Sequence, residues 1–194
     1  MFPVNIPNVL TLLRILAVPV LVVALLEETP DGDVIAAAVF ALAALTDGLD
    51  GYIARRRSEV TTFGKLMDPL ADKLLVIAAL ISLVSLDRLA AWVAMVIIAR
   101  ELAVTGLRSV AAEQGVVIAA SWLGKAKTLL QVAAIICLIA FYPSPVWVDV
   151  LLYLAVAMTL ISGADYFLGL RRRIAEHRAE QARAPGMAAT TKPR

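Results

Sequence analysis

Four aspartates within residues 47–72 have the spacing of a metal site. Asp47 and Asp50 are three residues apart, and Asp68 and Asp72 are four apart. Both spacings put the two members of a pair on one face of a helix. An ionised carboxylate in hydrocarbon costs at least about 3 kcal/mol, so acids beside strongly apolar segments need a neutralising partner. Because Mg²⁺ prefers oxygen ligands, two facing helices with these pairs predict a divalent-cation site.

Small residues accompany the acids. Gly51 and Ala54 leave a groove beside the first pair, and Gly64 lets the connecting loop turn. The full pattern is D-x2-D-G-x2-A-R-x8-G-x3-D-x3-D, formed by Asp47, Asp50, Gly51, Ala54, Arg55, Gly64, Asp68 and Asp72. This pattern resembles the signature of the CDP-alcohol phosphotransferases at every position. The alternative, two solvated helix ends with scattered acids, leaves the spacing unexplained.

The resemblance implies a reaction in which CDP-diacylglycerol and an alcohol give a phosphodiester lipid and CMP. It also implies two divalent cations, Mg²⁺ or Mn²⁺, held mainly by Asp47, Asp50 and Asp68. Two metal ions can stabilise the charge that develops on the transferred phosphoryl group and on the leaving phosphate. Asp72 is then expected to be the general base that takes the proton of the alcohol, and it also contacts a metal.

The donor half of the site extends to the first apolar segment. The stretch N-I-P-N-x-L-T-x-x-R at residues 5–14 resembles the family's entry to its first helix. Asn8 and Thr11 would then bind the nucleotide, although helix capping by Asn8 explains that residue equally well. The residues that the resemblance assigns to the CDP-lipid are Asn8, Thr11, Asp47, Gly51, Ala54, Arg55, Gly64 and Asp68.

The acceptor half is expected between residues 99 and 128. The pieces A-R-E, L-R and S-W-L-G-K-A-K-T in this segment resemble the phosphatidylglycerophosphate synthase branch of the family, whose acceptor is glycerol 3-phosphate. The cations expected at the acceptor phosphate are Arg108, Lys125, Lys127 and Arg100. Arg108 and Lys125 are the best placed, because Arg100 has Glu101 as a structural partner and Lys127 is explained equally by the positive-inside rule.

Other acceptors remain open at this stage. The signature handles only the shared CDP half, so phosphatidylglycerol, inositol phosphate or serine could replace glycerol 3-phosphate. Asp165 and Tyr166 could close the acceptor pocket, or they could pair with a cation, which we favour. A divalent-cation carrier is the alternative from another class. Paired broken helices and a site at the midplane, which are typical of carriers, are not indicated.

Composition places the chain in a membrane. Its 194 residues are 61% hydrophobic, and its mean hydropathy is +0.84. A formal net charge of +2 is too small to suggest a nucleic-acid partner. The single cysteine, Cys137, excludes a disulfide framework. We expect one membrane domain over residues 1–172 and a basic, disordered tail over residues 173–194.

Hydropathy predicts an all-α integral membrane protein with six transmembrane helices. Each is close to the length that crosses a hydrocarbon core of about 30 Å. Residues 1–8 precede them as a short juxtamembrane segment whose prolines discourage a long helix. The six expected spans cover residues 10–26, 34–55, 68–86, 89–110, 122–142 and 146–170.

Lysine and arginine set the expected orientation. The basic segments are residues 55–65, residues 108–127 and the tail, and they alternate with acidic or neutral turns. Both termini and the metal site should therefore face the cytoplasm, in the cytoplasmic membrane of a bacterium. At 1.5 Å per residue, Asp47 and Asp72 lie about 21 and 22 Å from the outer ends of their helices, at matching depth. Membrane lipids and a second copy, as a homodimer, are the expected partners.

Overall fold

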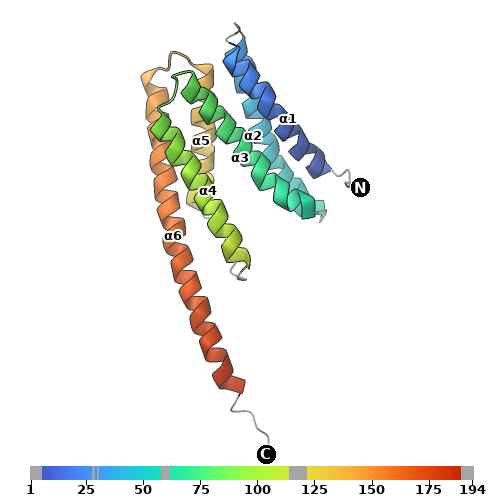
Figure 1. Cartoon of the computed structure of the whole chain (residues 1–194), viewed down its shortest axis with the longest axis vertical. Helices are drawn as coiled ribbons and strands as arrows, with labels where there is room; N and C mark the ends of the chain where they lie inside the picture. Colours follow the sequence, from blue (N-terminus) through green and yellow to red (C-terminus); the bar gives the residue numbers. More distant parts are fainter. Residues whose placement is uncertain (1–5, 28, 30, 58–61, 114–121, 189–194) are drawn as a thin grey trace, which may run out of the picture.

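The computed structural model describes residues 6–27, 29, 31–57, 62–113 and 122–188, with the side chains of 6–8, 47–57, 62–69, 72 and 172–188 outside the description (Figure 1). Every regular element in this part of the chain is an α-helix, as expected. The helices are α1 Ile6–Leu26, α2 Gly32–Arg57, α3 Thr62–Ser85, α4 Ala91–Glu113, α5 Trp122–Ala140 and α6 Val146–Ala188.

Successive helices run in opposite directions, and they form two groups (Figure 1). α1 packs along both α2 and α3, while α6 packs along α5 and α4. Contacts between α2 and α5 and between α3 and α4 join the groups. Helices α1, α3 and α5 therefore begin, and α2, α4 and α6 end, toward one end of the bundle. We call this the motif end, and we call the opposite end the closed end.

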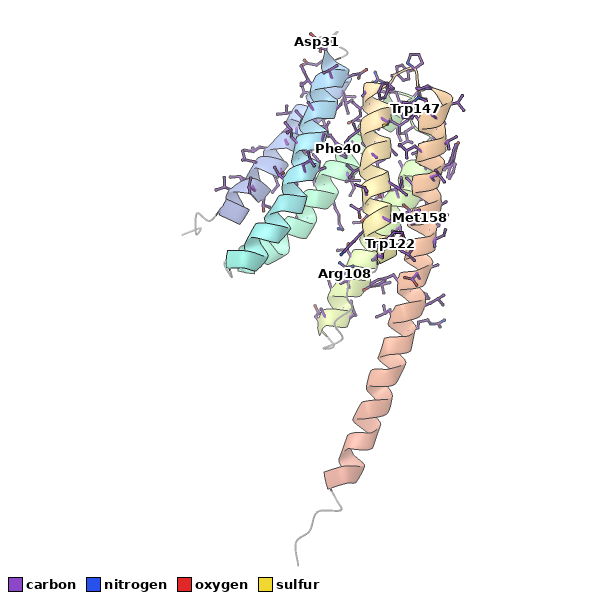
Figure 2. The ribbon with its side chains drawn as sticks, turned by 180° about the vertical axis from the view of Figure 1, so that it is seen from behind. Asp31, Phe40, Arg108, Trp122, Trp147 and Met158 are labelled. Carbon is purple, nitrogen blue, oxygen red and sulfur yellow. The ribbon has the colours of Figure 1, made fainter. Side chains whose placement is uncertain are left out.

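The hydrophobic core lies toward the closed end. Leu25 of α1, Phe40 of α2 and Leu83 of α3 are at most 1% exposed and belong to one cluster with Ile139 of α5 and Val148 of α6. These residues come from the last turns of α1, α3 and α5, the third turn of α2 and the first turn of α6, and Val93 near the start of α4 belongs to the same cluster. Figure 2 marks Phe40 in this half and Arg108 in the other half.

Arg88 ties three turns together at the closed end. Its Nη1 donates to Asp33 Oδ1 at 2.6 Å, which joins the α3–α4 turn to the first turn of α2. Its guanidinium carbon lies 4.2 Å from the centre of the Tyr142 ring, in the α5–α6 turn. Asp87 has φ 55°, a left-handed conformation that lets the short turn reverse the chain. The closed end is thus fixed by packing and by polar contacts.

The surface of the bundle is apolar in the way that lipid requires. Large side chains such as Leu12, Leu42, Met95 and Leu129 are more than half exposed. By length and composition, three helices of the described chain are candidate membrane spans, at Val9–Leu26, Trp122–Ala140 and Val146–Arg171. The protein is a membrane protein on this evidence. Among the described residues, α2 and α3 contain shorter apolar stretches, at Gly32–Thr46 and Lys73–Ser85.

The helix ends differ from expectation at both termini. α1 begins at Ile6, inside the segment expected to precede it, because Pro7 falls in the first helical turn, where proline is tolerated. Helix α6 continues to Ala188, into the segment from residue 173 that the sequence predicts to be a disordered tail. Residues 171–182 read R-R-R-I-A-E-H-R-A-E-Q-A, which are helix-compatible residues without glycine or proline.

Candidate functional site

The four signature aspartates lie on two consecutive antiparallel helices. Asp47 and Asp50 lie in the motif-end half of α2, and Asp68 and Asp72 lie in the motif-end half of α3. The two helices contact each other, and α1 packs against both. Both pairs therefore belong to the same end of the bundle, at helical spacing. Their side chains are outside the description, so their convergence on one point remains a prediction.

The residues expected at the CDP-lipid are on the same three helices. Gly51, Ala54 and Arg55 belong to α2, and Gly64 belongs to α3, all outside the described side chains. Asn8 lies in the first turn of α1, after the helix has begun at Ile6, so its backbone position is not that of the capping residue. Thr11 is described and is only 2% exposed. Its burial fits a polar role inside the bundle.

A cavity of about 740 Å³ opens between the two groups of helices. Five helices, α2 to α6, line it, and its walls combine apolar side chains of α2 and α5 with charged and hydroxyl-bearing side chains. A volume of this size suits a small molecule. The polar lining residues are Lys73, Arg100, Glu101, Thr105, Arg108, Lys125, Thr128, Ser162 and Tyr166.

Two of the four expected phosphate-binding cations face this cavity without a carboxylate partner among the described residues. Arg108 of α4 and Lys125 of α5 are both exposed and both line it. The guanidinium carbon of Arg108 lies 5.8 Å from the centre of the Tyr166 ring on α6. Figure 2 shows Arg108 on the lower part of α4, beside α6. Their positive charge is therefore available to an anion that enters the cavity.

The other two cations are held by the protein. Lys127 is 2% exposed, and its Nζ forms an ion pair with Glu101 Oε1. Arg100 Nη1 lies 3.8 Å from the same oxygen, and Arg100 Nη2 donates to Ser162 Oγ at 2.9 Å. A buried charge needs such partners. Lys125 and Lys127, two residues apart, thus have separate environments, as their helical spacing predicts.

Gly163 makes room for Arg100. A Cβ atom at this position would lie 3.3 Å from Arg100 Cγ and 3.8 Å from Arg100 Nε, so a larger residue would press on the arginine stem. Ser162 and Gly163 together therefore hold the Arg100 side chain against α6. Sequence reasoning missed this contact between Arg100 and α6, and it also missed Lys73 as a residue that lines the cavity. The only signal for Lys73 was its position directly after Asp72.

The expectations for Glu101, Asp165 and Tyr166 meet different outcomes. Glu101 lies near Arg100, as expected, but its closer partner is Lys127 of α5, which is 26 positions further along the chain. Tyr166 lines the cavity and contacts a cation. Asp165 is exposed on the same helix. Tyr166, and not its acidic neighbour Asp165, is among the α6 residues that line the cavity.

Residues 4–161 match the sequence profile of the CDP-alcohol phosphatidyltransferase family. A CDP-diacylglycerol–glycerol-3-phosphate 3-phosphatidyltransferase of Bacillus subtilis is 44% identical over 84% of this chain and 93% of its own length. A protein of the same name from Rickettsia bellii is 37% identical over 87% of this chain and 96% of its own. A probable phosphatidylglycerophosphate synthase of Mycobacterium tuberculosis is 42% identical over 84% of this chain and 79% of its own.

The match spans α1 to α5 and the first part of α6, and it includes the aspartate signature and the cavity-lining residues of α2 to α5. The chain belongs to the CDP-alcohol phosphatidyltransferase family.

Proposed function

We propose that this protein transfers the phosphatidyl group of CDP-diacylglycerol to glycerol 3-phosphate, giving phosphatidylglycerophosphate and CMP. The observation on which this rests is the near full-length similarity to relatives named for that reaction. The cavity supports it, because an acceptor with a phosphate needs cations that no protein carboxylate already neutralises. Among the described residues, Arg108 and Lys125 meet that requirement.

Arg108 and Lys125 bind the acceptor phosphate in this proposal. The planar guanidinium of Arg108 can donate two parallel hydrogen bonds to phosphate oxygens, and its ring contact with Tyr166 limits its orientations. Lys125 adds a second charge from the facing helix. Arg100 and Lys127 serve mainly to hold α4, α5 and α6 in register, since Lys127 pairs with Glu101 and Arg100 Nη2 donates to Ser162.

The donor binds at the aspartate signature in this proposal. Asp47, Asp50, Asp68 and Asp72 are hard oxygen donors at helical spacing on contacting helices, and this donor set fits two divalent cations, Mg²⁺ or Mn²⁺. Bound cations would stabilise charge on the pyrophosphate of the donor. Gly51 and Ala54 leave room for the cytidine end, and Arg55 contacts the donor phosphates.

The reaction is a displacement at the phosphorus that bears the diacylglycerol. The 1-hydroxyl oxygen of glycerol 3-phosphate forms a bond to this phosphorus, and the bond from the phosphorus to the oxygen of CMP breaks. Asp72 accepts the hydroxyl proton, and CMP leaves with its phosphate ionised. Arg108 and Lys125 hold the acceptor so that its hydroxyl faces the donor, which converts a bimolecular encounter into a positioned one.

The proposed setting is the cytoplasmic membrane of a bacterium. All six helices cross it, the motif end faces the cytoplasm, and the lipid tails of the donor leave between helices into the bilayer. The apolar outer surface and the alternating helix directions support this arrangement (Figure 1). A homodimer is part of the proposal by analogy with the family.

An acceptor screen with purified protein tests the reaction. CDP-diacylglycerol, Mg²⁺ or Mn²⁺ and each of four labelled acceptors (glycerol 3-phosphate, phosphatidylglycerol, inositol phosphate and serine) are incubated, and the lipid product and CMP are measured. Glycerol 3-phosphate should give both products in equal amounts, and a chelator should abolish them. Product from another acceptor alone, or activity that survives chelation, would contradict the proposal.

A further inference from the structure

Tyr166 has a hydroxyl group that nothing in the described chain satisfies. Its oxygen is buried and has no hydrogen-bond partner among the described residues, although the residue lines the cavity. A buried hydroxyl without a partner costs free energy, and such a group in a native structure calls for an explanation. A ligand in the cavity that accepts a hydrogen bond would remove the cost.

The position of Tyr166 on α6 indicates which ligand group this is. Ser162 and Tyr166 are four residues apart and share one face of the helix. Ser162 accepts from Arg100, and the Tyr166 ring lies beside Arg108. This face of α6 therefore contacts both arginines of α4, and the Tyr166 ring lies beside Arg108, which has no carboxylate partner in the described chain.

We infer that Tyr166 is a specificity-determining residue for the acceptor, with its ring orienting Arg108 and its hydroxyl donating to an oxygen of the phosphomonoester that Arg108 binds. The inference rests on the proposed function for the identity of the acceptor. The ligand chemistry itself follows from the cavity, because an oxygen-rich anion satisfies an arginine and a phenol together. A soluble phosphomonoester is the occupant, and not the headgroup of a membrane lipid.

The test compares Tyr166→Phe with Tyr153→Phe in the full-length protein in phosphate-free detergent. Tyr153 is a matched control, because it lies on the same helix, is more than half exposed, and stacks on Trp92 at the other end of the bundle. Binding of glycerol 3-phosphate and of inorganic phosphate is measured by calorimetry, and KM and kcat are measured with both substrates.

Tyr166→Phe should weaken glycerol 3-phosphate binding and raise its KM about tenfold, the effect of one lost hydrogen bond. The KM for CDP-diacylglycerol should change less than about twofold, and inorganic phosphate should weaken in parallel with glycerol 3-phosphate. Tyr166→Leu, which also removes the ring from Arg108, should be weaker still. Tyr153→Phe should match the wild type.

Binding by Tyr166→Phe that equals the wild type would overturn the inference, as would equal increases in both KM values. Competition by phosphatidic acid that depends on the Tyr166 hydroxyl would overturn the choice of a soluble ligand. The wild-type protein could bind glycerol 3-phosphate, lose that binding on Tyr166→Phe, and yet form no lipid from glycerol 3-phosphate. That result would uphold the inference and reject the proposed reaction. Calorimetry thus separates the two.

Discussion

At the scale of single residues, some cations of the site are available to a ligand, and others pair with protein groups and stabilise the helix packing. Arg108 and Lys125 line the cavity without a carboxylate partner in the described chain, whereas Lys127 is buried against Glu101. Lys125 and Lys127, two positions apart on α5, therefore have different environments and different expected roles. A cation that the protein has already neutralised has little attraction left for a substrate phosphate, so the partners of each cation separate the two roles.

Replacing Asp72 by asparagine should lower kcat by about 100- to 10,000-fold, the usual contribution of a general base. Asparagine has nearly the same shape but cannot accept the hydroxyl proton. CDP-diacylglycerol should still bind, because three other carboxylates remain. The measurement is steady-state turnover together with equilibrium binding of the donor. Asp165→Asn, which changes an exposed acid of α6, is the control. Turnover near the wild-type rate would remove Asp72 from the base role.

Replacing Arg108 by alanine should raise the KM for glycerol 3-phosphate about 10- to 100-fold, the effect of losing charge-assisted hydrogen bonds to a phosphate. The KM for CDP-diacylglycerol should change little, because the donor binds at the aspartate signature. Kinetics with each substrate varied in turn provide the measurement. Arg171→Ala removes an exposed arginine of α6 that contacts Phe167 and serves as the control. Equal effects on both KM values would place Arg108 outside the phosphate pocket.

At the scale of elements, α4, α5 and α6 are joined by a polar network inside an otherwise apolar bundle. Glu101 of α4 pairs with Lys127 of α5, and Arg100 of α4 donates to Ser162 of α6. In a lipid environment, helices gain little from apolar burial against each other, so directional contacts and close packing set their arrangement. The network therefore fixes the walls of the cavity from which Arg108 and Lys125 extend.

Glu101→Gln should destabilise the protein by about 3 to 5 kcal/mol, because it removes the carboxylate that pairs with the buried Lys127 charge. Lys127→Met should be costly for the complementary reason. The double variant should be less destabilised than the sum of the single variants, since neither charge remains alone. Thermal unfolding of the four proteins in detergent completes the cycle. Additive single effects would show that the ion pair does not join α4 to α5.

At the scale of the whole molecule, the bundle is closed at one end and open at the other. Large apolar side chains and the Arg88 contacts hold the closed end, while the cavity and the aspartate-bearing halves of α2 and α3 lie toward the motif end. This asymmetry suits an enzyme that takes a water-soluble acceptor from one side and a lipid donor from the bilayer.

The proposed orientation predicts different labelling of two exposed positions. Asp31→Cys places a thiol at the closed end, and Arg171→Cys places one on α6 beyond the cavity. Each is built on a Cys137→Ala background, because Cys137 is only half-buried and its thiol would be a second target for the maleimide. In intact cells with a permeable outer layer, a membrane-impermeant maleimide should label position 31 directly and position 171 only after the inner membrane is opened. The reverse pattern would place the motif end outside.

Most of the secondary structure and the family could be predicted from the sequence, whereas the donor half of the site stays a prediction. Runs of apolar residues located all six helices, because a chain in lipid must satisfy its backbone within each segment. The signature from Asp47 to Asp72 indicated the family, because its chemistry depends on carboxylates at fixed helical spacing. Hydropathy does not indicate how far α6 continues beyond residue 172, since a polar segment with good helix formers can extend a helix as well as fray.

Only the tertiary structure decided how the cations are used. Glu101 and Lys127 lie 26 positions apart, and Arg100 and Ser162 lie 62 apart. Pairs of this kind depend on how each helix is rotated about its axis and on which helices pack together. Hydropathy leaves both undetermined, because lipid-facing and protein-facing positions in a membrane helix are similarly apolar. The sequence by itself therefore determined which residues could do the chemistry, and the packing of α4, α5 and α6 decided which of the cations remain available to a substrate.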